Sequence, residues 1–194
     1  NLSDQEMRNC LLVMIGKEFY KKIKAMNDNP DFRECIPLSN NSIEKREDME
    51  LVVRFLVARN CNFDEIKYNV NMGDYLTEKI MAIAKDESIN FEKEIENFIN
   101  TFSYLNRLLG EDVFKRYYKE EDRFKGAVLI SSFEAIVLGV SRNLESLKQK
   151  SDKEICNKIK KMYSHPGYIE GTRRGIRTPQ RFKELSFFSM KYFS

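Results

Sequence analysis

In this chain of 194 residues, 42% of the residues are hydrophobic and 12% are aromatic, which is enough for a folded core and excludes an intrinsically disordered chain. Eight glycines and four prolines are fewer than an all-β chain of this length normally needs for its turns, and strong helix formers are abundant, so we expect an all-α fold. The net charge of +3 excludes no class of partner, although the charges are unevenly distributed along the chain.

Helical signals begin near the start of the sequence. Ser3 and Glu6 fit a capping box ahead of the apolar run MRNCLLVMI. Gly16 interrupts this run, and the segment KEFYKKIKAM then shows apolar residues at helical spacing. Asn29 is placed to cap a further short helix that opens with Pro30.

The middle of the chain contains stronger helical patterns. Segments 43–60, 73–85 and 90–109 each carry an apolar stripe with the helical period. The acidic residues in the first of these segments fit a solvated helix face better than a pair of catalytic acids. Segment 110–124 predicts a short helix and a loop, and nothing in the chain shows the two-residue period of a strand.

Segment 126–149 is apolar on several faces through Val140, which predicts a largely buried central helix. Together with segment 90–109, it supplies the residues that we place in the core. These residues are Phe98, Phe102, Val128, Ile130, Phe133, Ile136 and Val137.

The end of the chain predicts a loop followed by a helix. Residues 164–178 are expected to form an irregular basic loop, and residues 179–193 a C-terminal helix. Thr178 is the predicted N-cap of this helix, and Pro179 suits its first position. We therefore expect one helical domain over residues 1–194, arranged as an irregular bundle of about seven to nine helices.

Basic residues are concentrated in the last third of the chain. Between Lys148 and Lys183 there are eleven Lys or Arg residues and three acidic residues, a local net charge of +8. The remainder has 22 basic and 27 acidic residues, a net charge of −5. Such asymmetry is expected if one face of the protein meets a polyanion. The alternative is that the Lys148–Lys161 part is a lysine-rich, solvated helix.

Four arginines in this region are the candidate nucleic-acid-binding residues. They are Arg173, Arg174, Arg177 and Arg181. Gly171 and Gly175 allow a tight turn and a close approach to a ligand, and the planar guanidinium suits phosphate oxygens. The start of the C-terminal helix would add free N–H groups and a favourable dipole. The alternative is that these arginines pair with acidic residues of the body, such as those near Glu120.

The sequence contains no recognisable catalytic, cofactor or metal motif. Neither a phosphate-binding glycine loop nor a Gly-x-Ser-x-Gly elbow is present. Cys156 and His165 would pair as a nucleophile and base only by chance of folding. We therefore expect no catalytic residues, no cofactor and no metal in this chain. A hidden active site is the remaining alternative.

The cysteines and the apolar runs bear on the cellular compartment. Cys10, Cys35, Cys61 and Cys156 are far apart, so they fit reduced thiols in the cytoplasm, although an extracellular disulfide framework has the same count. The longest apolar runs, such as CLLVMI and AIVLGV, are too short to span a bilayer, and no signal peptide is visible. We expect a cytoplasmic protein without a membrane partner.

Four segments of the chain together resemble a known family. They are LSDQEMRNCLL…GKEF, EDMELVVRFLVAR, GEDVFKRYY and SSFEAIVLGVSRNL. In their order and spacing they resemble the helical C-terminal half of the GmrSD-type restriction endonuclease subunit domain. This is a ParB-like nucleotide-hydrolase and nuclease domain that is widespread in bacterial anti-phage systems. The likeness extends from Leu2 to about Phe182.

The resemblance implies a longer parent protein with a catalytic half. In the family, an N-terminal ParB-like half carries an Asp-Gly-Gln-Gln-Arg motif, and some members add a C-terminal His-Asn-His nuclease domain; this chain has neither. It begins NLSDQEMRN, without an initiator Met, so we expect a fragment of that parent. The resemblance places Gln5, Arg8 and Asn9 at the junction with the missing half. Arg8 is expected to face that half, the alternative being an ordinary surface arginine.

Two functions follow from these patterns. The first is a helical, non-catalytic portion of a restriction or anti-phage defence protein that supports the ParB-like half and contacts DNA. The second is a structural or protein–protein interaction module with no role toward nucleic acid, favoured by the absence of a recognisable site and by the aromatic-rich end FFSMKYF.

Overall fold

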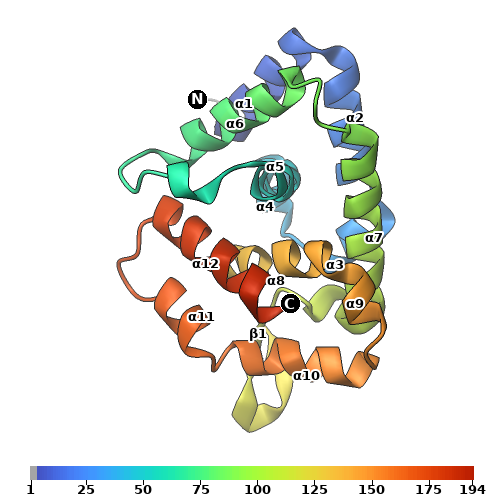
Figure 1. Cartoon of the computed structure of the whole chain (residues 1–194), viewed down its shortest axis with the longest axis vertical. Coiled ribbons are helices and arrows are strands. Elements are labelled where there is room, and N and C mark those ends of the chain that lie inside the picture. The colour runs from blue at the N-terminus through green and yellow to red at the C-terminus, as the bar shows by residue number, and fades with distance from the viewer. Residues whose placement is uncertain (1–3) are drawn as a thin grey trace.

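The computed structural model describes residues 4–194, with all side chains in this range except those of Asp4, Gln5, Met7 and Ile15. The described chain is 73% helical, which confirms the all-α class (Figure 1). Its helices are α1 (Asp4–Ile15), α2 (Lys17–Asn27), α3 (Pro30–Cys35), α4 (Asn40–Glu44), α5 (Glu47–Asn60), α6 (Met72–Lys85), α7 (Phe91–Leu109), α8 (Ile130–Arg142), α9 (Leu144–Lys148), α10 (Asp152–Met162), α11 (Pro166–Gly171) and α12 (Thr178–Tyr192). The capping box expected at Ser3 lies outside the described residues.

The twelve α-helices found within residues 4–194 exceed the seven to nine that the sequence predicts. The excess comes partly from single-turn helices that the sequence did not predict, such as α4 and α11, which are too short to carry an apolar period. It also comes from a break in the expected 126–149 helix. That helix begins only at Ile130 and is interrupted at Asn143, whose amide nitrogen donates to the carbonyl oxygen of Gly139 at 2.9 Å. A side chain that bonds the backbone in this way competes with helix continuation.

A small antiparallel hairpin corrects the expectation that no strand is present. Strands β1 (Arg116–Tyr118) and β2 (Arg123–Lys125) pair over three residues each, and a 3₁₀ turn at Lys119–Glu121 connects them. Asp122 completes the turn with a left-handed φ of 46°. Three-residue strands are too short to show an alternating sequence pattern. In Figure 1 the hairpin projects beyond α10 at the lower end of the molecule.

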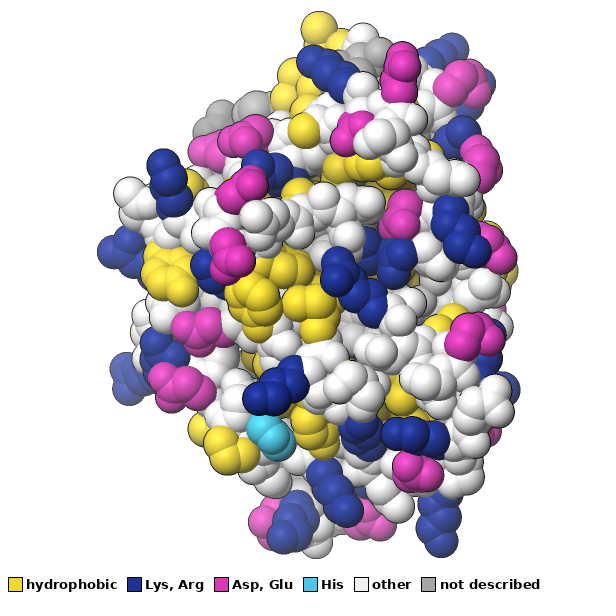
Figure 2. Space-filling view, in the orientation of Figure 1, with side chains coloured by type: hydrophobic (Ala, Val, Ile, Leu, Met, Phe, Trp, Pro, Cys, Tyr) yellow, Lys and Arg dark blue, Asp and Glu magenta, His cyan; other side chains and the backbone are white. Residues whose placement is uncertain are grey.

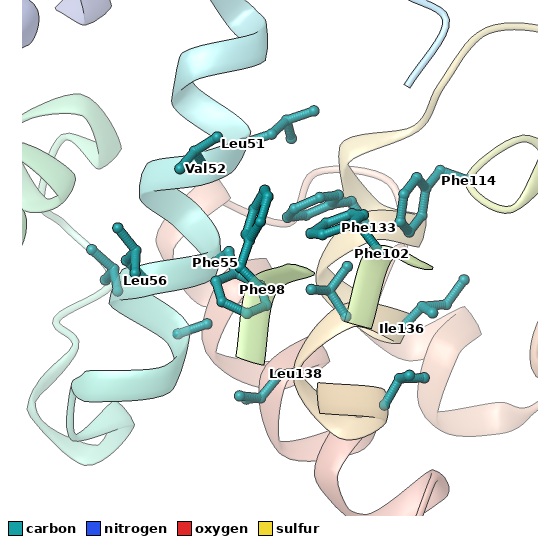
Figure 3. Close-up of a cluster of buried hydrophobic side chains, with 14 of the residues drawn as sticks. Leu51, Val52, Phe55, Leu56, Phe98, Phe102, Phe114, Phe133, Ile136 and Leu138 are labelled. Carbon is teal, nitrogen blue, oxygen red and sulfur yellow. The ribbon is translucent and has the colours of Figure 1, made fainter. Parts of the chain in front are cut away.

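The core lies where α5, α7 and α8 meet, and phenylalanine rings form its centre (Figure 3). Phe98 and Phe102 of α7 have ring centroids 4.5 Å apart. Phe55 meets Phe98 edge-on at 5.1 Å, and Phe133 stacks on Phe102 at 6.1 Å. Offset and edge-to-face pairs of this kind add to the stabilisation from apolar burial.

Five of the seven predicted core residues are buried, one packs against the edge of the core, and one is exposed. Phe98, Phe102, Phe133, Ile136 and Val137 are buried. Val128 precedes α8 and packs half-buried against the core, and Ile130 is 37% exposed because it starts the helix. The first residue of a helix lacks the preceding turn that would shield its side chain.

Helices α8 and α12 pack closely against each other, and a glycine permits the close approach. The backbone nitrogen of Gly139 donates to Oγ of Ser189 at 2.8 Å. A Cβ atom on Gly139 would lie 2.1 Å from the carbonyl oxygen of Ser189, closer than any two such atoms can approach. Glycine is therefore required at this crossing because its neighbour is backbone, which cannot rotate away.

Phe133→Ala should lower the free energy of unfolding by about 3–5 kcal/mol, because it removes a ring from a close-packed centre and leaves a cavity. The matched control is Ile130→Ala in the same helix, which should change stability by less than about 1 kcal/mol. Denaturant unfolding followed by circular dichroism measures both variants. Equal losses for the two variants would contradict the placement of the core.

Gly139→Ala should destabilise the protein by about 1–3 kcal/mol or more, because the added methyl group forces α8 and α12 apart. Ser189→Gly introduced into the same variant removes Oγ but leaves the carbonyl oxygen in place. The double variant should therefore remain as unstable as Gly139→Ala in thermal unfolding. Full recovery of the melting temperature in the double variant would show that the side chain, not the backbone, sets the helix separation.

Candidate nucleic-acid interface

The four predicted phosphate-binding arginines do not act as one patch in the structure. Arg173 pairs with two carboxylates, Glu170 at 2.6 Å and Glu184 at 3.4 Å. Arg181 pairs with Glu134 of α8 at 2.8 Å. Arg173 and Arg181 therefore pair with acidic residues of the protein itself, which was the alternative to phosphate binding. Their partners, however, are not the acidic residues near Glu120.

Arg181 belongs to a buried charge cluster that joins three helices. Glu134 of α8 is fully shielded from solvent and accepts hydrogen bonds from Nη1 of Arg54 at 2.7 Å and from Nε of Arg181 at 2.8 Å. Arg54 also donates from Nε to Glu50 at 3.0 Å. Burial lowers the pKa of Arg181, but the neighbouring groups, the Glu134 carboxylate foremost, together raise it by more, so the guanidinium stays charged. Only 22% of the Arg181 side chain is exposed, which makes it an anchor for α12.

Like the paired Arg173, both Arg174 and Arg177 are solvent-exposed. Within residues 4–194, neither makes an ion pair. They lie around a turn in which Gly175 has a φ of 85°, a conformation that glycine adopts without strain. Free charge on an exposed turn keeps these two residues available to an anionic ligand.

The backbone around these arginines differs from the expectation at two points. Helix α11 occupies Pro166–Gly171, within the segment predicted to be an irregular loop over residues 164–178. His165 caps this helix through Nδ1, which accepts from the backbone nitrogen of Gly167 at 3.0 Å. Arg177, not Thr178, stands at the N-cap of α12 and makes no side-chain cap hydrogen bond. A helix start without a side-chain cap does not by itself make an anion site.

Arg8, expected at an interdomain junction, is instead buried inside the chain. Its Nε donates to Oγ1 of Thr77 and its Nη2 to the carbonyl oxygen of Gly73, both at 3.0 Å. The guanidinium therefore fastens α1 to α6, and it does not lie on the surface of this chain. Asn9 is half-buried on α1, whereas the side chain of Gln5 lies outside the described part of the structure.

A cleft that the sequence did not reveal lies between the hairpin, α10, and the ends of α11 and α12. Its volume is about 650 Å³. We call it the lysine–aromatic cleft and define it by Tyr117, Lys119, Lys160, Lys161, His165 and Tyr192. Three lysines and one aspartate, Asp122, line the cleft, so its local charge is positive.

One of the three lysines is already neutralised inside the cleft. Lys160 donates to Oδ1 of Asp122 at 2.7 Å, and the hydroxyl of Tyr117 donates to the same oxygen at 2.7 Å. The hydrogen bond with Asp122 raises the pKa of Lys160, and the same contact lowers the pKa of Asp122. Because Lys160 belongs to α10 and Asp122 to the hairpin, this contact holds the two sides of the cleft together.

Lys119 and Lys161 are the exposed cations of the cleft. Neither makes an ion pair within the part of the chain that the structure describes. Lys119 lies in the hairpin turn and Lys161 near the end of α10, so the two stand on different walls. Two unpaired ammonium groups flanking one cleft favour a ligand with more than one negative charge.

Aromatic rings form the remaining walls of the cleft. Tyr192 stacks on Phe188 with centroids 5.0 Å apart, and its hydroxyl donates to the carbonyl oxygen of Lys158 at 2.8 Å. The ring of His165 meets Tyr192 edge-on at 5.2 Å. Figure 2 shows this histidine, in cyan, between hydrophobic side chains, with Lys and Arg side chains around them. Aromatic surface combined with free lysines is typical of sites that bind nucleic acid.

Sequence reasoning missed the cleft because its walls are far apart in the chain. Lys160 and Lys161 belong to the basic segment Lys148–Lys183, and His165 is the single histidine of the sequence. The hairpin that supplies Tyr117 and Lys119 was not predicted. Without the hairpin, nothing in the sequence brings residues near 117 to the end of α12.

The described residues lack several other kinds of site. No group of three or more His, Cys, Asp or Glu side chains is placed to hold a metal ion within them. No described helix combines the length and the apolar character needed to cross a membrane. All four cysteines are free, and burial raises the pKa of Cys35 to about 12 and that of Cys61 to about 11. These two thiols therefore stay protonated near neutral pH and are poor nucleophiles.

No known protein family, no curated protein and no solved structure matches this chain.

Glu134→Gln should lower the free energy of unfolding by about 3–5 kcal/mol, because it leaves two guanidinium groups without their buried counter-charge. Arg174→Ala, the matched surface control, should change stability by less than about 0.5 kcal/mol. Thermal and denaturant unfolding measure both variants. If Glu134→Gln behaves like Arg174→Ala, the cluster does not anchor α12.

Proposed function

We propose that this chain is the helical, non-catalytic portion of a bacterial restriction or anti-phage defence protein of the GmrSD type, and that it contacts nucleic acid through the lysine–aromatic cleft. The four sequence segments that resemble this family support the first part. In the parent protein, this helical portion would brace a ParB-like catalytic half. The cleft supports the second part.

The observation that carries the nucleic-acid role is the pair of unpaired lysines, Lys119 and Lys161, on opposite walls of one aromatic-lined cleft. The third lysine of the cleft, Lys160, is already paired with Asp122. A polyanion with regularly spaced phosphates matches two cations held apart by a rigid wall. The exposed Arg174 and Arg177 would extend the basic surface if the bound strand continues toward them.

The segments that carry the family likeness lie mainly in the scaffold. The segment EDMELVVRFLVAR falls in α5, and SSFEAIVLGVSRNL covers most of α8 and the start of α9. These helices supply Arg54 and Glu134 to the buried charge cluster, as well as phenylalanines of the core. The likeness therefore rests on residues that build the fold, which fits a supporting role for this portion.

A second candidate function is protein–protein interaction without nucleic acid. Helix α1 exposes two apolar side chains, Val13 at 44% and Met14 at 81%. Exposed apolar side chains on adjacent positions are a common feature of surfaces that a partner covers. This candidate places the interface on α1, at the opposite end of the molecule from the cleft (Figure 1).

The double variant Lys119→Ala/Lys161→Ala should reduce the salt dependence of DNA binding. Each phosphate contact contributes about −0.9 to the slope of log affinity against log salt on duplex DNA and about −0.7 on a single strand. Losing two contacts should therefore make the slope less steep by about 1.4–1.8. Fluorescence anisotropy with a labelled oligonucleotide, titrated at several salt concentrations, gives the slope.

Controls separate the cleft from general surface charge. Lys85→Ala removes an exposed lysine from the end of α6, far from the cleft, and should leave the slope nearly unchanged. Arg174→Ala/Arg177→Ala tests the turn before α12 in the same assay. If the unsubstituted chain binds no DNA at low salt, the nucleic-acid role is wrong and the interaction surface on α1 becomes the better candidate.

A further inference from the structure

We propose that the lysine–aromatic cleft accepts an unpaired nucleotide, so that the chain binds single-stranded nucleic acid in preference to a duplex. The inference rests on the proposed nucleic-acid function and specifies the form of the ligand. It follows from the shape of the cleft, the fixed position of its rings, and the placement of its free polar and cationic groups.

The shape of the cleft favours an inserted base. Proteins read a duplex with a convex element, a helix or a strand pair, that enters a groove. Here the charged and aromatic groups line a hollow of about 650 Å³ between the hairpin and α10. This volume lies within the range of pockets that enclose a small organic ligand, which is the size of one nucleotide. A base that is paired within a duplex cannot enter such a hollow, whereas an unpaired base can.

The aromatic walls are fixed before any ligand binds. Tyr117 is held through its hydroxyl by Asp122, and Lys160 lies 5.3 Å from the centre of its ring. Tyr192 is held through its hydroxyl by the backbone of Lys158 and through its ring by Phe188. Rings that are already immobilised lose little conformational freedom when a ligand packs against them. The exposed ring of His165 supplies a further flat surface beside them.

Free polar groups complete a site of the right chemistry. Asn157 and Ser164 line the cleft and are solvent-exposed, so an amide and a hydroxyl are available to the edge of a base. Lys119 and Lys161 flank the cleft as the cations for the phosphates on either side of the inserted nucleotide. One hollow therefore holds polar groups for the edge of a base, aromatic rings for its flat face and two lysines for its phosphates. These are the contacts that an unpaired strand makes with a protein.

The test compares a labelled 12-nucleotide single strand of mixed sequence with the duplex of the same sequence, at one low salt concentration, by fluorescence anisotropy. An RNA single strand of the same length is measured beside the DNA strand, and the tighter binding of the two shows whether the natural ligand is DNA or RNA. The single strand should bind at least about tenfold more tightly than the duplex. Ser164→Leu fills part of the cleft but leaves every charge in place, and should weaken single-strand binding by about tenfold, the effect of losing one stacked base.

Controls and alternative outcomes decide the inference. The Lys85→Ala variant should bind the single strand as tightly as the unsubstituted chain does. The circular dichroism spectrum of Ser164→Leu should match that of the unsubstituted chain. Single-strand binding that is unaffected by Ser164→Leu would overturn the placement of the base in the cleft. If the duplex binds as tightly as the single strand and its binding still depends on Lys119 and Lys161, the inference is overturned but the proposed function remains. Absence of binding to every oligonucleotide would overturn both.

Discussion

The buried carboxylate of Glu134 is the contact on which the arrangement of the molecule depends. It receives one guanidinium from α5 and another from α12, while its own helix, α8, lies in the core. A carboxylate that is shielded from water and lacks partners is costly by several kcal/mol, and so is a buried guanidinium without its counter-charge. The three helices therefore cannot move apart independently, because any separation would expose or orphan a charge.

Helix α12 links the buried charge cluster to the proposed site. The charge cluster fixes the first part of α12 through Arg181, and the Gly139–Ser189 crossing fixes its later part. Tyr192, at the last residue of the helix, is then placed against α10. One wall of the lysine–aromatic cleft is thus set by the same helix that the buried charges anchor, while the Lys160–Asp122 pair sets the wall formed by the hairpin.

Arginines of the same short segment have different roles because their surroundings differ. Arg181 is one turn into α12 and faces α8, where Glu134 draws it into the protein. Arg174 lies on an exposed turn and remains free in the described part of the chain. Sequence spacing treats the two as equivalent, since both are charged and close to a helix start. Only the direction in which each side chain points separates a structural anchor from a candidate ligand contact.

The sequence by itself determined the helical class and the apolar centre of this protein. Phe98 and Phe102 are one helical turn apart, so the local period alone places them on the same buried face. The tertiary structure decided which charged residues enter the interior, such as Arg8 and Glu134, because each needs a partner far away in the chain. The tertiary structure also determined where the cleft forms, because its walls come from residues up to 75 positions apart in the sequence, Tyr117 and Tyr192. Local patterns record the period of one helix, but they contain no information about which distant helix supplies the opposite charge or the opposite wall.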